Sequence, residues 1–158
     1  MNWQEVCENP NLQNIPFKIE LNEYGQVVMS PMKVIHSLLQ GEIERLLLCC
    51  ITSGKVFPEC AIHTDKGTKV ADVVWVSEQR LAQIKYEMEC SIAPEICIEV
   101  LSDSNSEKEM NEKKLLYFQQ QAQEFWLCDQ QGVMRFFNPQ SELVHSELAP
   151  QFPNKINI

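Results

Sequence analysis

Two short apolar runs decide the fold: VADVVWV at Val70–Val76 and ICIEVL at Ile96–Leu101. Both are rich in β-branched residues, which predicts buried strands. Each run is interrupted by a single acid, Asp72 in the first and Glu99 in the second. The residues two positions away on either side are apolar, so each acid shares a strand face with hydrophobic side chains. A carboxylate buried in this way is costly unless it is paired, protonated or bound to a metal.

On neighbouring central strands, Asp72 and Glu99 would converge into one oxygen-rich site. Carboxylate oxygens are the ligands that hard cations such as Mg²⁺ and Mn²⁺ prefer. The alternative for each acid is structural: a strand-end carboxylate that faces solvent, a backbone amide or an ion-pair partner gives the same pattern. The residues by themselves leave both interpretations open.

The flanking sequence supplies helix caps, turn residues and apolar periodicity that place the other elements. The first predicted elements are a strand at Gln26–Met29 and a helix capped by Ser30-Pro31 and stopped by Gly54. Strands follow at Lys55–Thr64, Lys69–Ser77 and Glu95–Leu101, with a polar loop or short helix at Glu78–Ile92 between the last two. The chain then predicts a helix from a Ser106-x-x-Glu109 capping box to about Gln121, a hairpin of Glu124–Asp129 and Val133–Asn138, and a short strand near Leu143–Ser146. This order predicts a mixed α/β sandwich rather than a regular doubly wound sheet. We expect one domain, residues 1–158, with 1–17 as an irregular lead-in and 148–158 as a tail.

The composition limits the functional classes. The chain has 158 residues, with 13 Lys and Arg against 22 Asp and Glu and a formal net charge of −9. An acidic domain repels phosphate unless its few cations are clustered, which argues against bulk attraction to nucleic acid. No apolar run approaches the ~20 residues of a membrane helix, and the first residues, MNWQEVCENP, lack the features of a secretory signal. We therefore expect no membrane partner.

The seven cysteines form no CxxC pair and lie mostly inside apolar runs such as LLLCCI and FWLCD. They lack the paired spacing of a zinc site, and free cysteine commonly behaves as a small buried hydrophobic residue. The pattern indicates reduced core thiols in a cytoplasmic protein.

The second predicted helix offers a cation near the acids. Its apolar positions Met110, Tyr117 and Phe118 place both Lys113 and Lys114 close to the packed stripe, and the spacing does not choose between them. A helical lysine usually extends to solvent, which is the alternative for either one. Two carboxylates, a divalent metal and a nearby ammonium would suit phosphodiester hydrolysis.

Five segments together resemble one family. The runs GQVVMSP with a following histidine, VADVVWVS, PEICIEVLSDSNS, EKKLLYF and EFWLCD are similar, in sequence and order, to the Uma-two family of restriction-endonuclease-like proteins in the PD-(D/E)XK nuclease superfamily. The resemblance covers about residues 20–137. It implies an α/β fold with a restriction-endonuclease-like core, a mixed central sheet flanked by helices. It also implies dependence on Mg²⁺ (or Mn²⁺) and a DNA substrate.

The resemblance also assigns residues. Asp72 and Glu99 match the family's two metal-binding acids, and Lys113 matches its lysine, which lies four residues before the helix tyrosine. Glu20 and His36 match a frequent acid and a frequent histidine and are additional site candidates. For His36 the alternative is a capping or surface histidine.

The chain departs from the pattern at three positions. Ala71 and Leu101 stand where the superfamily motif has proline and lysine. Asp103 replaces a frequent proline and adds negative charge near the expected site, where it would either help to hold metal or repel DNA.

The leading hypothesis is a metal-dependent endonuclease that hydrolyses phosphodiester bonds in DNA, with Asp72, Glu99 and Lys113 as catalytic residues. A homodimer is compatible with it, because a duplex has two strands to cut. The first alternative is a catalytically silent interaction or oligomeric module on the nuclease scaffold, favoured by the acidic charge and by Leu101. The second is a hydrolase of small phosphate esters, which would need no basic DNA track.

Overall fold

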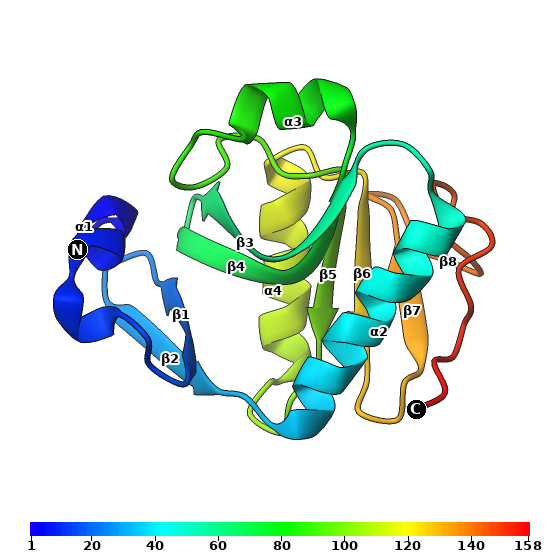
Figure 1. Ribbon diagram of the computed structural model, residues 1–158, viewed down its shortest axis with the longest axis horizontal. Helices are drawn as coiled ribbons and strands as arrows, with labels where there is room; N and C mark the ends of the chain where they lie inside the picture. Colours follow the sequence, from blue (N-terminus) through cyan, green and yellow to red (C-terminus); the bar gives the residue numbers. More distant parts are fainter.

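A six-stranded mixed sheet forms the centre of the computed structural model, which describes residues 1–158 (Figure 1). Its strands, in spatial order, are β3 (Lys55–Thr64), β4 (Gly67–Val76), β5 (Ile96–Val100), β6 (Glu124–Cys128), β7 (Met134–Phe137) and β8 (Glu142–Leu143). Only β5 and β6 pair in parallel, and the other neighbours are antiparallel. The ends of the predicted strands agree with the structure within two residues, except at the last strand. There β8 shares only Leu143 with the predicted Leu143–Ser146.

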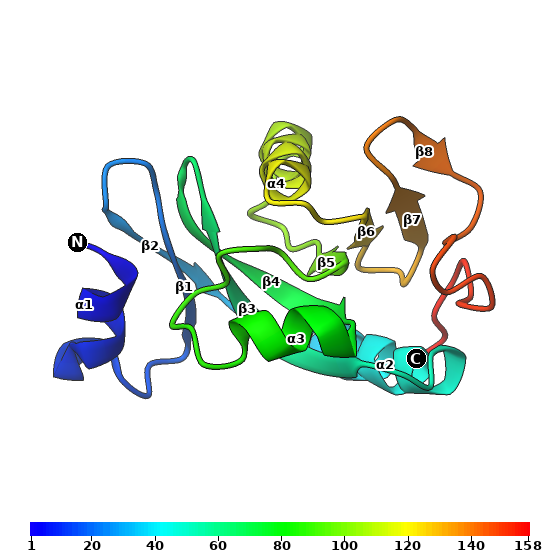
Figure 2. The same cartoon turned by 90° about the horizontal axis from the view of Figure 1, so that it is seen from above.

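Two helices cover opposite faces of this sheet, α2 (Val34–Cys50) and α4 (Glu107–Gln119), as Figure 2 shows from above. On one face α2 packs Leu39, Ile43 and Leu47 into a core that contains Trp126. On the other face α4 packs its apolar side chains against the second core, which includes Phe125. The prediction of a mixed sheet flanked by helices is confirmed.

The 148–158 tail contributes Ala149, Phe152 and Ile156 to the α2-side core, so these residues close that face of the sheet. None of the helices combines the length and the apolar character that crossing a bilayer requires.

The N-terminal residues differ from the expected irregular lead-in. They form α1 (Trp3–Glu8), a 3₁₀ turn (Pro10–Leu12) and the start of β1 (Phe17–Leu21). A capping box between Asn2 and Glu5 stabilises the start of α1. The helix is short and has too little apolar periodicity to be recognised in the sequence.

Strand β1 pairs only with β2 (Val27–Pro31), in a two-stranded sheet separate from the central one. This hairpin lies against β4: the Lys69 ammonium donates to the Leu21 carbonyl at 3.1 Å. Gly67, at φ +85°, faces the Leu21 carbonyl so closely that an added Cβ would lie 2.4 Å from that oxygen. The first residue of β4 must therefore be small and left-handed for the hairpin to dock.

Helix starts were predicted with mixed success. Ser30-Pro31 is not an N-cap, because both residues belong to β2 and α2 begins only after Lys33, which makes no side-chain cap. Ser106 does cap α4, accepting from the Glu109 amide. The polar segment after β4 contains α3 (Glu78–Ile84).

All seven cysteines are free thiols. Four of them are buried in the sheet layers, whereas Cys7 and Cys49 are exposed and Cys50 is half-buried. The prediction of core thiols therefore holds for four positions, and the cysteines at the ends of α1 and α2 are corrections to it.

Candidate active site

The two strand acids lie where β4 and β5 separate. The pairing of these strands ends at Val73 and Ile98, one residue short of Asp72 and Glu99. Beyond that point the Val100 amide donates to Asp72 Oδ2 at 2.7 Å instead of to a strand partner. The carboxylates fill the gap that the separating strands leave, and they are only 1% and 2% exposed.

A lysine that the sequence interpretation missed binds both acids. The Lys18 Nζ of β1 lies 2.9 Å from Asp72 Oδ1 and 3.2 Å from Glu99 Oε2. The signal that would have found it is its position two residues before Glu20 on a strand, which puts both side chains on one face. Lys18 thus fills the space between the two acids with a positive charge.

Helix α4 supplies the second cation. The Lys113 Nζ lies 3.3 Å from Glu99 Oε1 and 2.9 Å from Glu20 Oε2, and the side chain is almost fully buried. One turn further on, the Tyr117 hydroxyl donates to the same Glu99 oxygen at 2.7 Å. Lys114 instead lies 4.3 Å from the centre of the Phe137 ring. The structure therefore brings Lys113 to the acids and leaves Lys114 outside.

The two additional candidates are also present in the cluster. His36, near the start of α2, is 7% exposed, and its Nε2 lies 3.3 Å from Asp72 Oδ2. The alternative of a surface histidine therefore does not apply, and its Nδ1 is buried without a hydrogen-bond partner. Glu20 accepts from the Val70 amide at 2.7 Å, which fixes β1 against β4.

Burial and neighbouring charges give the acids opposite protonation behaviour. Burial raises the pKa of Glu99 to about 7, although Lys113 and Lys18 oppose this shift. Burial would also raise the pKa of Asp72, but Lys18 and His36 outweigh it and hold that pKa well below its usual range. Asp72 is thus ionised at neutral pH, whereas Glu99 titrates near it.

The acids raise the pKa values of Lys18 and His36. The pKa of Lys18 is raised well above its ordinary value, because Glu99 and Asp72 outweigh the opposing effect of burial. The hydrogen bond to Asp72 raises the pKa of His36 in spite of its burial. The cluster is therefore held together by charge-assisted contacts.

The donor set fits a divalent metal. The space between Asp72 Oδ1 and Glu99 Oε2 already accommodates one cation, the Lys18 ammonium, and oxygen donors of this kind suit Mg²⁺ or Mn²⁺. No three side chains of the His, Cys, Asp or Glu type are arranged as a ready metal site. The carboxylate oxygens instead contact two ammonium groups, those of Lys18 and Lys113.

Asp103 lies outside the cluster. It is exposed, pairs with Lys33 and accepts from the Gln130 amide group at 2.7 Å. Its charge is therefore compensated by Lys33 at the surface, and its role toward metal or DNA stays a prediction. Ser102 and Ser104 hydrogen-bond to each other in the same loop, as turn residues do.

Comparisons with known proteins identify the family of the chain. A family model described as "Putative restriction endonuclease", that of the Uma2 (Uma-two) family, matches residues 3–155. The chain therefore belongs to the Uma2 family, a family of nuclease-like proteins. No curated protein matches the sequence.

Among solved structures, the chain is similar to one from Anabaena variabilis ATCC 29413, whose title calls it "a putative nuclease belonging to DUF820". The TM-score is 0.73 at 21% sequence identity, and the match covers 94% of this chain and 91% of the other. At that identity the similarity establishes a shared fold.

Proposed function

We propose that the protein is a metal-dependent endonuclease that hydrolyses phosphodiester bonds in DNA. The observation that carries the proposal is the convergence of Asp72 and Glu99 on one shared cation, with the buried Lys113 on the other oxygen of Glu99. Membership of the Uma2 family supports the nuclease class.

Each residue has a role that follows from its contacts. Asp72 and Glu99 would hold Mg²⁺ or Mn²⁺, which supplies an activated water and stabilises charge on the phosphate. Lys113, held by Glu20 and Glu99, offers an ammonium that can donate to a phosphate oxygen as negative charge develops there. Tyr117 and His36 act as positioning residues, because each fixes one carboxylate by a direct contact.

The acidic surface is compatible with this proposal. The net charge of −9 disfavours strong nonspecific binding to DNA. Inside the cluster, Lys18 and Lys113 are paired with the buried acids. A divalent ion held by Asp72 and Glu99 would add positive charge there, in a space of low dielectric constant where it acts more strongly than at the surface. We therefore propose weak binding of DNA with catalysis that depends on a local cation group.

The test is cleavage of supercoiled plasmid and of single-stranded DNA with Mg²⁺ or Mn²⁺. Asp72→Asn keeps the size of the side chain and removes its charge, and Asp65→Asn, in the exposed turn between β3 and β4, is the matched control. We expect wild type and Asp65→Asn to cleave and Asp72→Asn to be inactive. Equal cleavage by all three proteins would indicate a contaminating nuclease and remove the assignment.

One observation favours a second candidate, a catalytically silent module on the same scaffold. Lys18 and Lys113 already pair with the buried acids, so the fold has internal counter-ions and does not need a metal for stability. Calorimetry with Mn²⁺ separates the two candidates. Binding that Glu99→Gln abolishes supports the enzyme, and absence of binding at millimolar Mn²⁺ supports the module.

A further inference from the structure

The pocket around the catalytic carboxylates is too small to hold a nucleobase. Its volume is about 20 Å³, close to what one water molecule needs. A cavity of about 510 Å³ lies directly beside it, within the range of ligand-binding pockets. Lys18 and Met32 line both spaces, so a group bound in the larger cavity is adjacent to the site of the reaction.

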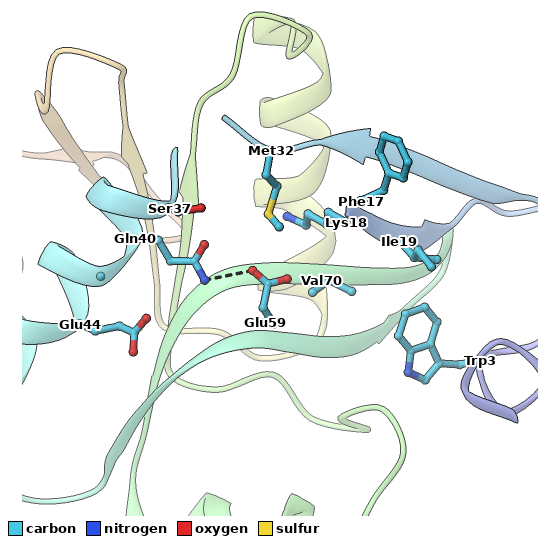
Figure 3. Close-up of a pocket in the computed structure, with 11 residues that line it drawn as sticks. Trp3, Phe17, Lys18, Ile19, Met32, Ser37, Gln40, Glu44, Glu59 and Val70 are labelled. Atoms are coloured by element: carbon cyan, nitrogen blue, oxygen red, sulfur yellow. Dashed lines mark hydrogen bonds between the residues drawn. The ribbon is translucent and has the colours of Figure 1, made fainter. Parts of the chain in front are cut away.

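The lining of the larger cavity combines apolar walls with one polar edge (Figure 3). Phe17 and Met32 are both partly exposed and offer flat or polarisable surfaces. Gln40 reaches from α2 toward Glu59 of β3, and its amide donates to the Glu59 carboxylate at 3.0 Å (Figure 3). Such an arrangement is suited to a planar ring with hydrogen-bonding groups on its edge.

The charges of the lining exclude a phosphate as its ligand. Lys18 is the only cation there, and it is bound to Asp72 and Glu99, whereas Glu44 and Glu59 are both acidic. A neutral ligand that donates hydrogen bonds is compatible with this set. Exocyclic amino groups of cytosine and adenine are donors of that kind.

Glu59 also has an unusual backbone. Its φ is +56°, in the left-handed region that residues with a side chain seldom adopt. It lies opposite Asp72 in the β3–β4 register, at the one position where the pairing is interrupted between Pro58 and Cys60. Strain of this kind concentrates at functional sites, and here it marks the polar edge of the cavity next to the catalytic acid.

We infer that this cavity binds an unpaired nucleobase of the DNA strand being cut, and that Glu59 and Gln40 select a base with an exocyclic amino group. The base stacks on Phe17 and Met32 while its phosphate reaches the acids past Lys18. This inference rests on the proposed nuclease function and extends it to the substrate class: single-stranded or locally unpaired DNA.

The test measures binding with a chelator present, so that cleavage does not interfere. Fluorescence anisotropy compares short labelled oligodeoxycytidine, oligothymidine and an abasic oligomer of equal length. We expect oligodeoxycytidine to bind about tenfold more tightly than the abasic strand. Phe17→Ala should remove most of this difference, and Glu59→Gln should remove the preference for cytosine over thymine. Tyr86→Ala and Glu78→Gln, which alter exposed residues elsewhere, are the matched controls.

Equal binding of the abasic and base-bearing strands would overturn the inference, as would an unchanged cytosine preference in Glu59→Gln. The same proteins are assayed for plasmid cleavage dependent on Asp72. Base-dependent binding without cleavage supports the pocket and removes the nuclease assignment. Cleavage together with binding that does not depend on the base contradicts the base-binding inference and supports the nuclease assignment.

Discussion

The Lys18 ammonium donates to Asp72 Oδ1 at 2.9 Å, across 54 positions of sequence. It contacts Glu99 as well, so one side chain neutralises the two acids that are expected to bind metal. A divalent ion that binds between these acids must therefore displace a buried ammonium. The apparent metal affinity is expected to include the cost of that displacement.

Lys18→Met should lower stability without metal and strengthen metal binding. Removing one partner leaves two buried carboxylates short of a counter-ion, which typically costs about 3–5 kcal/mol. The same change frees the position between the acids, so we expect Mn²⁺ affinity to rise by about tenfold or more. Thermal melting over a Mn²⁺ titration measures both effects, and Lys55→Met, at an exposed strand end, is the control. If Mn²⁺ raised the melting temperature of Lys18→Met less than that of wild type, the idea that the metal displaces the Lys18 ammonium would be contradicted.

Lys113→Met and Lys114→Met form a matched pair one residue apart. Lys113 contacts both Glu20 and Glu99, and Lys114 lies on the Phe137 ring. We expect Lys113→Met to reduce the rate of cleavage roughly 10²–10³-fold, as loss of one charge-stabilising donor does. Lys114→Met should cleave within a few-fold of wild type. An equal loss of cleavage rate in the two variants would show that the substitutions act by destabilising helix α4.

Metal binding should strengthen as the pH rises toward neutrality. Burial raises the pKa of Glu99 to about 7, so below that pH the carboxyl is mostly protonated and a proton must leave when metal binds. Calorimetry with Mn²⁺ should show affinity falling by up to about tenfold per pH unit below 7. Proton release is read from the dependence of the binding enthalpy on the buffer. Affinity that stays constant from pH 5.5 to 8, about the range of this titration, would rule out Glu99 as the titrating ligand.

The same pKa predicts the sign of a stability change without metal. The pKa of Glu99 is about 7 in the folded protein, above its ordinary value of 4.5. Its contribution to the free energy of unfolding is therefore fully present below pH 4.5 and is lost as the pH rises through about 7. A shift of this size corresponds to a few kcal/mol. Urea unfolding over this range should give a shallower pH dependence for Glu99→Gln than for wild type. An identical pH dependence in the two proteins would show that Glu99 does not titrate there.

Tyr117→Phe tests the positioning of Glu99. The hydroxyl donates to Glu99 Oε1 at 2.7 Å in a buried setting, and its loss is expected to cost about 1–3 kcal/mol of stability. Because the residue acts on the carboxylate rather than on DNA, kcat should fall while KM for DNA stays unchanged. The pH of half-maximal metal binding should also move upward, since the ionised carboxylate loses a donor. Tyr86→Phe, at an exposed position, is the control, and a change confined to KM would contradict the role.

Much of the central sheet could be predicted because its strands are continuous apolar runs with clear turns between them. Asp72 and Glu99 stood out for the same reason: a charge inside such a run has few structural explanations. The capping serine of α4 could also be predicted, because the helix start is defined by one local hydrogen bond, in which the Ser106 hydroxyl accepts from the Glu109 amide.

The rest depended on contacts between distant segments. The local sequence places Lys18 on the strand face of Glu20, but it does not indicate that the Lys18 ammonium crosses from β1 to the acids of β4 and β5. The choice between Lys113 and Lys114 needed the rotation of α4 about its axis, which spacing leaves open and packing decides. Ser30-Pro31 has the local pattern of a helix start, but pairing of Ser30 with Lys18 in the β1–β2 hairpin overrides it.

The β1–β2 hairpin shares no strand pairing with the central sheet, and the side chains that fasten it there include Lys18 and Glu20. Loading the site with a divalent ion would therefore release one of the hairpin's own anchors. Amide hydrogen exchange in β1 and β2 should speed up when the ion binds, even as the protein as a whole becomes harder to unfold. Ligand binding would then make one edge of this molecule more mobile rather than less.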